Sequence, residues 1–168
     1  VSTHLLSAAG SDGYKRQGLG RDPERTPMQW DTSENAGFTS GKPWLPLMEN
    51  FSRVNVKEQE MEKDSMLNFY KKLIQLRNNE PALNIGNYIP VLANGNMLSY
   101  LREFSGKRFL IALNLGESKE NCEPNLRPWK GKVRIGTHNE LSEKEFQNQI
   151  YLGPNLGMVV EILSEENN

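Results

Sequence analysis

The spacing of hydrophobic residues changes character near residue 82 and divides the chain into two parts. In the first part, residues 64–79 carry apolar side chains at the three- and four-residue spacing of one helical face. Asp64 or Ser65 can cap the start of this predicted helix, and Pro81 ends it. The stripe predicts a helix packed on a sheet or barrel, through Met66, Phe69, Tyr70, Leu73, Ile74 and Leu76.

In the second part the hydrophobic period becomes two, as in β-strands. Turn signals at Asn94-Gly95 and Ser105-Gly106 separate the first three runs. Two polar stretches, residues 116–130 and 138–148, interrupt the later runs. Short strands with turns between them are typical of an antiparallel sandwich. The predicted strands lie around residues 88–92, 97–102, 109–114, 133–135, 150–152 and 158–163.

The residues before the helix show no periodicity. Residues 7–20 are small and polar, and residues 32–49 are interrupted by glycine and proline. A structureless loop of that length is uncommon in a compact domain unless it is functional. Loop and helix together are too small to bury a core of their own, whereas the C-terminal part could fold as a small all-β domain.

Composition adds little to this picture. The 168 residues are 36% hydrophobic and 24% charged, which suits a soluble globular protein. The formal net charge of −1 gives no reason to expect nucleic acid or an anionic membrane as a partner. No apolar run approaches the roughly 20 residues of a membrane helix. Residues 1–6 lack the basic start and the long apolar centre of a signal peptide, so we expect none here. The chain opens on Val1, and we expect it to be a piece of a longer protein.

The candidate chemistry is concentrated in residues 21–31, RDPERTPMQWD. Pro23 and Pro27 prevent an ordinary helix, so the run is a stiff polar loop that presents Arg21 and Arg25. Such an arginine pair can clamp a carboxylate or phosphate, or hydrogen-bond sugar hydroxyls. It can also brace the loop by pairing with the neighbouring carboxylates. Bracing is the favoured interpretation for Arg21 and the less favoured one for Arg25.

Other side chains offer less. Trp30 and Trp44 could stack on a sugar, but burial in the core is the favoured interpretation. His4 and His138 are isolated and are expected on the surface. No GxSxG, P-loop, GxGxxG or CxxC motif occurs, and no catalytic carboxylate pair can be placed.

Two further residues bear on the cellular compartment. Cys122 is the single cysteine, so we expect either a semi-exposed free thiol or a disulfide partner upstream of this chain. Asn50-Phe51-Ser52 is an N-glycosylation sequon, which makes Asn50 a candidate glycosylation site.

Several motifs together resemble one known family. They are residues 21–31, NAGF (35–38), KPWLP (42–46), NVK (55–57), YKKLIQLR (70–77) and ALNLG (112–116). These segments, in this order, closely resemble maltases of the α-amylase superfamily, glycoside hydrolase family 13. The nearest types are insect α-glucosidases and bacterial oligo-1,6-glucosidases. The resemblance covers about residues 20–163, whereas residues 7–20 do not resemble the region that precedes the loop in the family.

The resemblance implies a fold. In that family a catalytic (β/α)8 barrel is followed by an antiparallel β-sandwich, domain C. It places residues 20–48 in the loop after the eighth barrel strand and the predicted helix as the last barrel helix. The expected architecture is therefore an α+β fragment. Residues 1–81 form the C-terminal end of the catalytic barrel, and residues 82–168 form the domain C sandwich. The loop then lies at the C-terminal face of the barrel, where barrel active sites are found.

The resemblance also implies roles for residues. The three catalytic carboxylates of the family lie on barrel strands upstream of this segment, so the segment contains no catalytic residue and is expected to be inactive alone. Arg25 corresponds to an arginine that, with an upstream Asp, hydrogen-bonds hydroxyls of the glucose whose bond is cleaved. Arg21 lines or braces the pocket. No cofactor is expected, and the family's calcium site, where present, also lies upstream.

The implied protein is a retaining α-glucosidase that acts on maltose, sucrose or short α-gluco-oligosaccharides. Its expected partners are these sugars and the rest of the barrel, and its expected location is secreted or extracellular, with or without a membrane anchor. Two alternatives stay open. One is a non-catalytic relative, such as the heavy subunits of amino-acid transporters. The other is a sucrose isomerase or transglucosidase. The intact Arg25 loop favours an enzyme.

Overall fold

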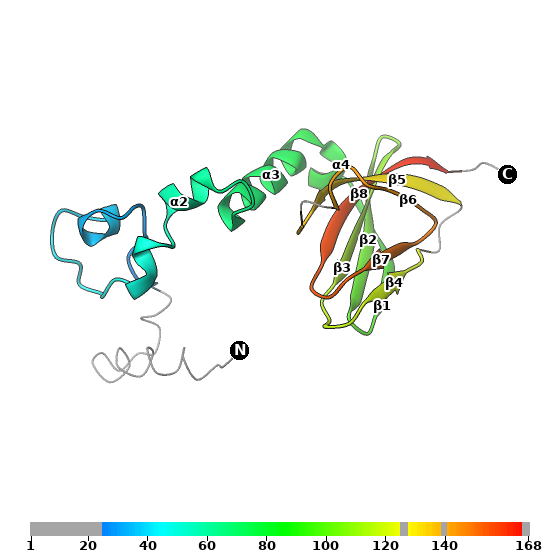
Figure 1. Ribbon diagram of the computed structural model, residues 1–168. Helices are drawn as coiled ribbons and strands as arrows, with labels where there is room; N and C mark the ends of the chain where they lie inside the picture. The colour runs from blue at the N-terminus through cyan, green and yellow to red at the C-terminus, as the bar shows by residue number, and fades with distance from the viewer. Residues whose placement is uncertain (1–24, 125–127, 139–140, 166–168) are drawn as a thin grey trace. The chain divides into compact units, whose positions relative to one another are not determined.

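The computed structural model describes residues 25–124, 128–138 and 141–165 (Figure 1). The chain forms two compact units, Val1–Asn68 and Phe69–Asn168, which we call the first and second unit and describe separately. The compact units divide after Asn68, so that most of the predicted helix belongs with the sheet. The boundary predicted between the barrel end and domain C, after residue 81, stays a prediction.

The first unit is a long loop fixed to a short helix. It contains the 3-10 helices η2 (Glu34–Gly37) and η3 (Glu49–Ser52) and the helix α2 (Val56–Met61). The first two N–H groups of α2, those of Val56 and Lys57, donate to the carbonyls of Gln29 and Trp30, each over 3.0 Å. These donors have no partner within the helix. The loop that follows Arg25 therefore serves as part of the cap of α2.

Asn55 completes this cap. Its Oδ1 accepts a hydrogen bond from the N–H of Glu58 over 2.9 Å, and its Nδ2 donates to the carbonyl of Phe51, also over 2.9 Å. The side chain is almost fully buried. An Asn at this position satisfies one orphan donor of the helix and ties η3 to α2.

The predicted helix is confirmed as α3 (Met66–Asn79). Of the two candidate caps, Ser65 fills the position, because its Oγ accepts from the N–H of Asn68 over 3.1 Å. Only half of the predicted stripe is covered. Phe69, Leu73 and Leu76 pack against the sheet, whereas Met66, Tyr70 and Ile74 are exposed by 54–66%.

The second unit is a mostly antiparallel β-structure, as expected. After α3 and the short helix α4 (Pro81–Asn84), six strands form one open sheet in the order β1-β2-β3-β8-β5-β6, and β4 pairs with β7 (Figure 1). The strands are β1 (Asn87–Asn94), β2 (Met97–Phe104), β3 (Lys107–Asn114), β4 (Glu120–Cys122), β5 (Trp129–Gly136), β6 (Glu145–Gln147), β7 (Ile150–Leu152) and β8 (Gly157–Glu165). The fold prediction, barrel remnant followed by an antiparallel β domain, is confirmed. β4 and β6 lie inside the stretches that were predicted as polar interruptions.

Both faces of the central strands are buried. Along β3, Leu110 and Ala112 belong to a core that includes Cys122, Ile150 and Leu152 of the β4–β7 pair. Phe109 and Ile111 point to the opposite face, where they meet α3 and α4. Because successive side chains alternate between faces, β3 needs apolar residues at consecutive positions. This explains its unbroken apolar run.

The hairpin turns follow the sequence signals with one shift. Ser105 and Gly106 connect β2 to β3 with φ values of 50° and 79°, which is the type I′ arrangement. In the first hairpin Asn94 pairs with Met97, so the two-residue loop is Gly95-Asn96, one residue later than the Asn94-Gly95 signal. No helix in the described part of the chain is long and apolar enough to span a membrane.

Candidate functional site

Arg25 lies at the start of the described chain, in the first unit, with its side chain exposed. Its guanidinium carbon is 6.0 Å from the centroid of the Trp44 ring, within the range of a cation–π contact. Arg21, the other predicted sugar-binding residue, lies outside the described residues. Of the two arginines, the structure therefore describes Arg25 alone, and one of its contacts is with an aromatic ring.

A left-handed turn shapes the loop between Arg25 and Trp44. Asn35, Ala36 and Gly37 have φ values of 53°, 55° and 66°. Ala36 is fully buried, and its carbonyl accepts hydrogen bonds from the N–H groups of Trp30 (2.9 Å) and Asp31 (3.3 Å). Non-glycine residues in this region carry strain that the surrounding structure must offset. The turn is therefore held in place by the burial of Ala36 and by the hydrogen bonds to its carbonyl.

Asp31 fastens the same turn. Its Oδ1 accepts from the N–H of Ser33 over 2.8 Å and from the Ser33 hydroxyl. These two hydrogen bonds lower the pKa of Asp31 below its usual value. A Cβ on Gly37 would lie 2.8 Å from the same oxygen, so glycine is needed for space as well as for its φ. Asp31 thus has a structural role in the turn. The sequence had suggested it only as a partner for an arginine.

The prediction that Trp30 and Trp44 are buried is wrong. Trp30 is 49% exposed and Trp44 is 75% exposed, while the small loop is filled by Ala36, Leu45 and Pro27. A loop without a layer of secondary structure on each side cannot enclose an indole ring. The sequence suggested Trp44 as a candidate for stacking on a sugar but favoured its burial, and its exposure was missed. The available signal was its position between Pro43 and Pro46, in a run that lacks the alternating hydrophobic pattern of a half-buried strand.

Asn50, the candidate glycosylation residue, lies in η3 and is exposed. Its Oδ1 accepts from Nε2 of Gln29 over 3.4 Å, which is a weak contact. The exposed position is compatible with modification, and glycosylation stays a prediction.

Cys122 contradicts the expectation of a semi-exposed thiol. It is fully buried in β4, and its Sγ donates to Oγ of Ser99 over 3.4 Å. It is free, and burial raises its pKa, an effect that the Ser99 contact opposes. The residue belongs to the core because β4, which the polar sequence around it concealed, packs on the large sheet.

Histidine and metal chemistry find little support in the described residues. His138 is exposed, as predicted, and His4 lies outside the described ranges. Across residues 25–124, 128–138 and 141–165, no three His, Cys, Asp or Glu side chains are grouped as metal ligands. None of these described residues is therefore assigned to a metal.

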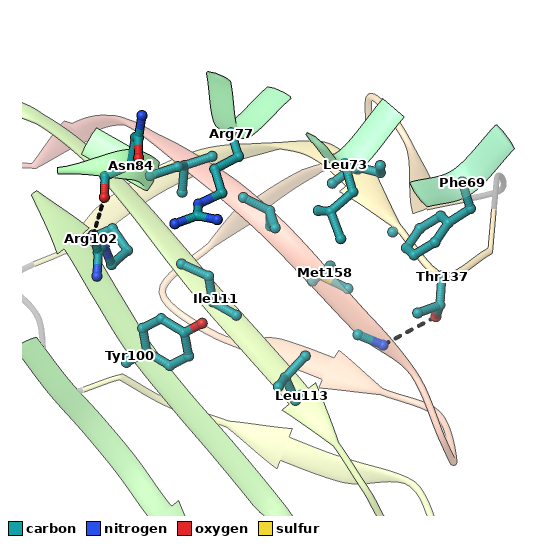
Figure 2. Close-up of a pocket in the computed structure, with 15 residues that line it drawn as sticks. Phe69, Leu73, Arg77, Asn84, Tyr100, Arg102, Ile111, Leu113, Thr137 and Met158 are labelled. Atoms are coloured by element: carbon teal, nitrogen blue, oxygen red, sulfur yellow. Dashed lines mark hydrogen bonds between the residues drawn. The ribbon is translucent and has the colours of Figure 1, made fainter. Parts of the chain in front are cut away.

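The second unit contains a cavity of about 590 Å³ (Figure 2). It lies between α3, α4 and the face of the large sheet that is opposite to the β4–β7 pair. Its floor is apolar, formed by residues such as Ile111, Leu113 and Met158. Arg102 lies at its edge and donates to the carbonyls of Ala82 (3.3 Å) and Asn84 (3.1 Å). No carboxylate lines it, so it offers no acid–base pair for hydrolysis. Its walls are suited to apolar packing.

Comparison with known proteins identifies the family. Residues 8–86 match the family model "Alpha amylase, catalytic domain". The chain is 36% identical over 137 residues to an oligo-1,6-glucosidase of Parageobacillus thermoglucosidasius, covering 80% of this chain and 24% of that protein. It is 41% identical over 125 residues to the trehalose-6-phosphate hydrolase of Escherichia coli K12, covering 71% of this chain and 21% of that protein.

A solved structure agrees with this result. The isomaltulose synthase of Klebsiella sp. LX3 superposes with a TM-score of 0.76 at 33% identity, over 84% of this chain and 26% of that one. The chain spans about a quarter of the length of these relatives.

The chain belongs to the α-amylase superfamily, glycoside hydrolase family 13, and carries part of its catalytic domain. The relatives are glycosidases and sugar synthases, as the resemblance implied. One detail of the sequence interpretation is corrected. The family match begins at residue 8, so residues 8–20 also resemble the family, although they had seemed to depart from it.

Proposed function

We propose that this chain is the C-terminal part of a retaining α-glucosidase, a maltase-type enzyme that hydrolyses terminal α-glucosidic bonds of maltose, sucrose or short α-gluco-oligosaccharides. The observation that carries the proposal is the Arg25 loop. It presents an exposed guanidinium near the ring of Trp44, on a loop whose later residues Trp30 and Asp31 hydrogen-bond to Ala36, in a segment that matches the catalytic domain. In this proposal the segment supplies substrate binding and domain C, and the bond-breaking carboxylates come from upstream.

Arg25 is suited to a sugar because a guanidinium offers five N–H donors and no acceptor. Hydrogen bonds from a charged donor to hydroxyl oxygens are stronger than neutral ones. Arg21 is assigned to the same pocket as a lining or bracing residue, by resemblance alone.

Asp31, a carboxylate of the described loop, has a structural role. Retaining hydrolysis needs a nucleophile and an acid/base about 5–5.5 Å apart, with the acid's pKa raised. Asp31 has a lowered pKa and holds Ser33, which suits it to structure and not to proton donation. We therefore expect no hydrolysis by the 168-residue chain alone.

The test is hydrolysis of p-nitrophenyl α-glucoside by the longer protein that contains this segment and by the chain itself. Arg25→Ala in the longer protein should lower kcat/KM about 10- to 150-fold, since a hydrogen bond to a charged group contributes about 1.5–3 kcal/mol. Arg25→Lys, the matched control, keeps the charge and should lose less. Equal kcat/KM for Arg25→Ala and wild type would contradict the assignment, and activity of the chain alone would contradict the missing carboxylates.

A second candidate is a sucrose isomerase. It is favoured by the superposition on isomaltulose synthase and on the trehalulose synthase of Pseudomonas mesoacidophila MX-45, the latter with a TM-score of 0.76 at 29% identity over 84% of this chain and 26% of that one. Product analysis from sucrose separates the two. Glucose and fructose indicate hydrolysis, whereas isomaltulose or trehalulose indicates isomerisation.

We also propose secretion or an extracellular location, supported by the exposed sequon at Asn50. Expression of the longer protein in a eukaryotic secretory host, followed by glycosidase treatment, should shift its mobility. Asn50→Gln should abolish the part of the shift due to this site, and an unchanged shift would contradict modification of Asn50.

A further inference from the structure

We propose that Trp44 is a positioning residue for Arg25. In this inference, which rests on the proposed function, the indole face holds the guanidinium so that its N–H groups are presented to a sugar. The carrying observation is the 6.0 Å separation between the guanidinium carbon and the Trp44 ring centroid. The two residues are 19 positions apart in the chain, so the contact is a product of the loop's fold.

The backbone at Trp44 is anchored by its neighbour, whereas the indole ring is mostly exposed. Its neighbour Leu45 is 2% exposed and anchors the chain, whereas the indole of Trp44 is 75% exposed. An indole exposed to this extent does not stabilise the loop by burial. Tryptophan is the best of the aromatic rings for holding a cation over its face.

The two arms of the loop are tied together on a common turn. On one side the carbonyl of Ala36 accepts from Trp30 and Asp31. On the other side Nδ2 of Asn35 donates to the carbonyls of Thr39 and Gly41, each over 3.1 Å. The arm that leads from Arg25 and the arm that leads to Trp44 are thereby connected by Asn35 and Ala36, adjacent residues of one turn.

The contact with Trp44 itself uses no hydrogen-bond donor of Arg25, because a ring attracts a cation through its charge. The ring can therefore orient the guanidinium without competing with a sugar hydroxyl for its N–H groups, which are its only hydrogen-bonding groups. A free arginine side chain carries about 2 kcal/mol of rotamer entropy, and holding it in advance lowers the cost of binding. The expected effect is on substrate affinity, so KM should change more than kcat.

A double-mutant cycle in the longer protein tests the coupling. Trp44→Leu should raise KM for p-nitrophenyl α-glucoside about two- to fivefold, the size of a partly exposed cation–π contact. Trp44→Phe should retain most of the affinity. In an Arg25→Ala background, Trp44→Leu should have no further effect, because the partner is already gone. Trp30→Leu is the matched control, an exposed Trp of the same loop, and its effect should be the same in both backgrounds.

The outcomes separate the inference from the proposed function. If Arg25→Ala leaves KM and kcat unchanged, the proposed function fails. If Arg25→Ala impairs binding but Trp44→Leu has the same effect with and without Arg25, the positioning role fails alone. A second measurement uses the 168-residue chain. The Nε–Hε resonance of Arg25 should be displaced by the ring current relative to that of Arg53, and Trp44→Phe should keep a displacement. An undisplaced resonance in wild type would overturn the inference even where Trp44→Leu does not fold.

Discussion

At the residue scale, the left-handed turn explains a glycine that the sequence alone leaves ambiguous. Gly37 has φ +66°, and a Cβ there would meet the Asp31 carboxylate at 2.8 Å. Gly41, in the same loop, has no positive φ and would place its Cβ no closer than 3.8 Å to Thr39. Comparing the two glycines therefore separates a position that requires glycine from one that does not.

We predict that Gly37→Ala lowers the free energy of unfolding of the first unit by about 1–2 kcal/mol, the cost of a left-handed non-glycine residue. Gly41→Ala should be neutral or slightly stabilising, because it restricts the unfolded chain. Urea titration followed by tryptophan fluorescence measures both. Equal destabilisation by the two variants would contradict the role assigned to the turn.

The thiol of Cys122 offers a second test at this scale. It is fully buried, and burial raises its pKa, so the reactive thiolate is scarce in the native state. We predict that a thiol reagent such as DTNB modifies the native chain very slowly and one thiol per chain in denaturant. Rapid modification of the folded protein would show that β4 does not pack on the sheet as described.

At the element scale, four charged residues fasten the end of α3 to the sheet. Lys107 Nζ on β3 lies 2.7 Å from Oε2 of Glu80 and 3.2 Å from Oε1 of Glu161 on β8. Arg134 on β5 pairs with Glu161 and lies 3.8 Å from Oε1 of Glu80. Both carboxylates are mostly buried, with exposed fractions of 12% and 16%. The cluster therefore connects the α3–α4 corner to three strands.

The pKa shifts in this cluster define a pH window. The hydrogen bond that Lys107 donates to Glu80 raises the pKa of Lys107 above its ordinary value of 10.5. The contribution of Lys107 is therefore complete below that pH and is lost as pH rises through the folded pKa. Burial alone would raise the pKa of Glu161, but the bonds from Arg134 and Lys107 prevail and lower it below 4.5. Its contribution is complete above pH 4.5 and is lost as pH falls further.

We predict that the free energy of unfolding of the second unit is steady around neutrality and falls below pH 4.5. Glu161→Gln should cost about 1 kcal/mol at pH 7, a modest value because Lys107 and Arg134 are partly exposed. The same variant should flatten the acid side of the profile. Urea titrations at several pH values measure both effects, and identical acid slopes for variant and wild type would contradict the assignment.

The sequence predicted those elements in which the hydrophobic pattern extends over several apolar positions. The helix now called α3 and the long strands β2, β3 and β8 were predicted from four or more apolar positions each. β4 and β6 were missed because three polar-looking residues form a strand only when a neighbouring strand supplies the hydrogen bonds. Cys122 was misplaced for the same reason, since its burial depends on β4.

The candidate site was predictable to the same degree. Arg25 followed from its motif and from resemblance. The exposure of Trp30 and Trp44 did not, because the average tendency of tryptophan to be buried fails in a loop with no layer to cover it. The Arg25–Trp44 contact depends on the turn at Ala36. The positive φ of this residue could not be predicted, because alanine does not favour the left-handed region.

At the scale of the whole molecule, the main consequence is an uncovered apolar surface on α3. Tyr70 and Ile74 are 55% and 54% exposed, on a helix whose other side packs against the sheet. Monomeric proteins rarely leave contiguous apolar surface open. Under the proposed function, the rest of the catalytic barrel covers this side of the last barrel helix.

We therefore predict that the 168-residue chain, produced alone, binds a hydrophobic dye such as ANS and self-associates with increasing concentration. Ile74→Lys should reduce both effects with little change in the free energy of unfolding, because the side chain is already exposed. Leu73→Lys is the matched control at the adjacent position. It should destabilise the second unit by about 2 kcal/mol or more, because it places a charge against the sheet. In the longer enzyme the expectation for Ile74→Lys reverses, since the residue would then be buried, and the variant should lower stability and activity. Dye binding, sedimentation velocity and urea titration measure these effects. A monomeric chain that binds no dye would show that the exposed side of α3 needs no partner, and would count against its assignment as a barrel helix.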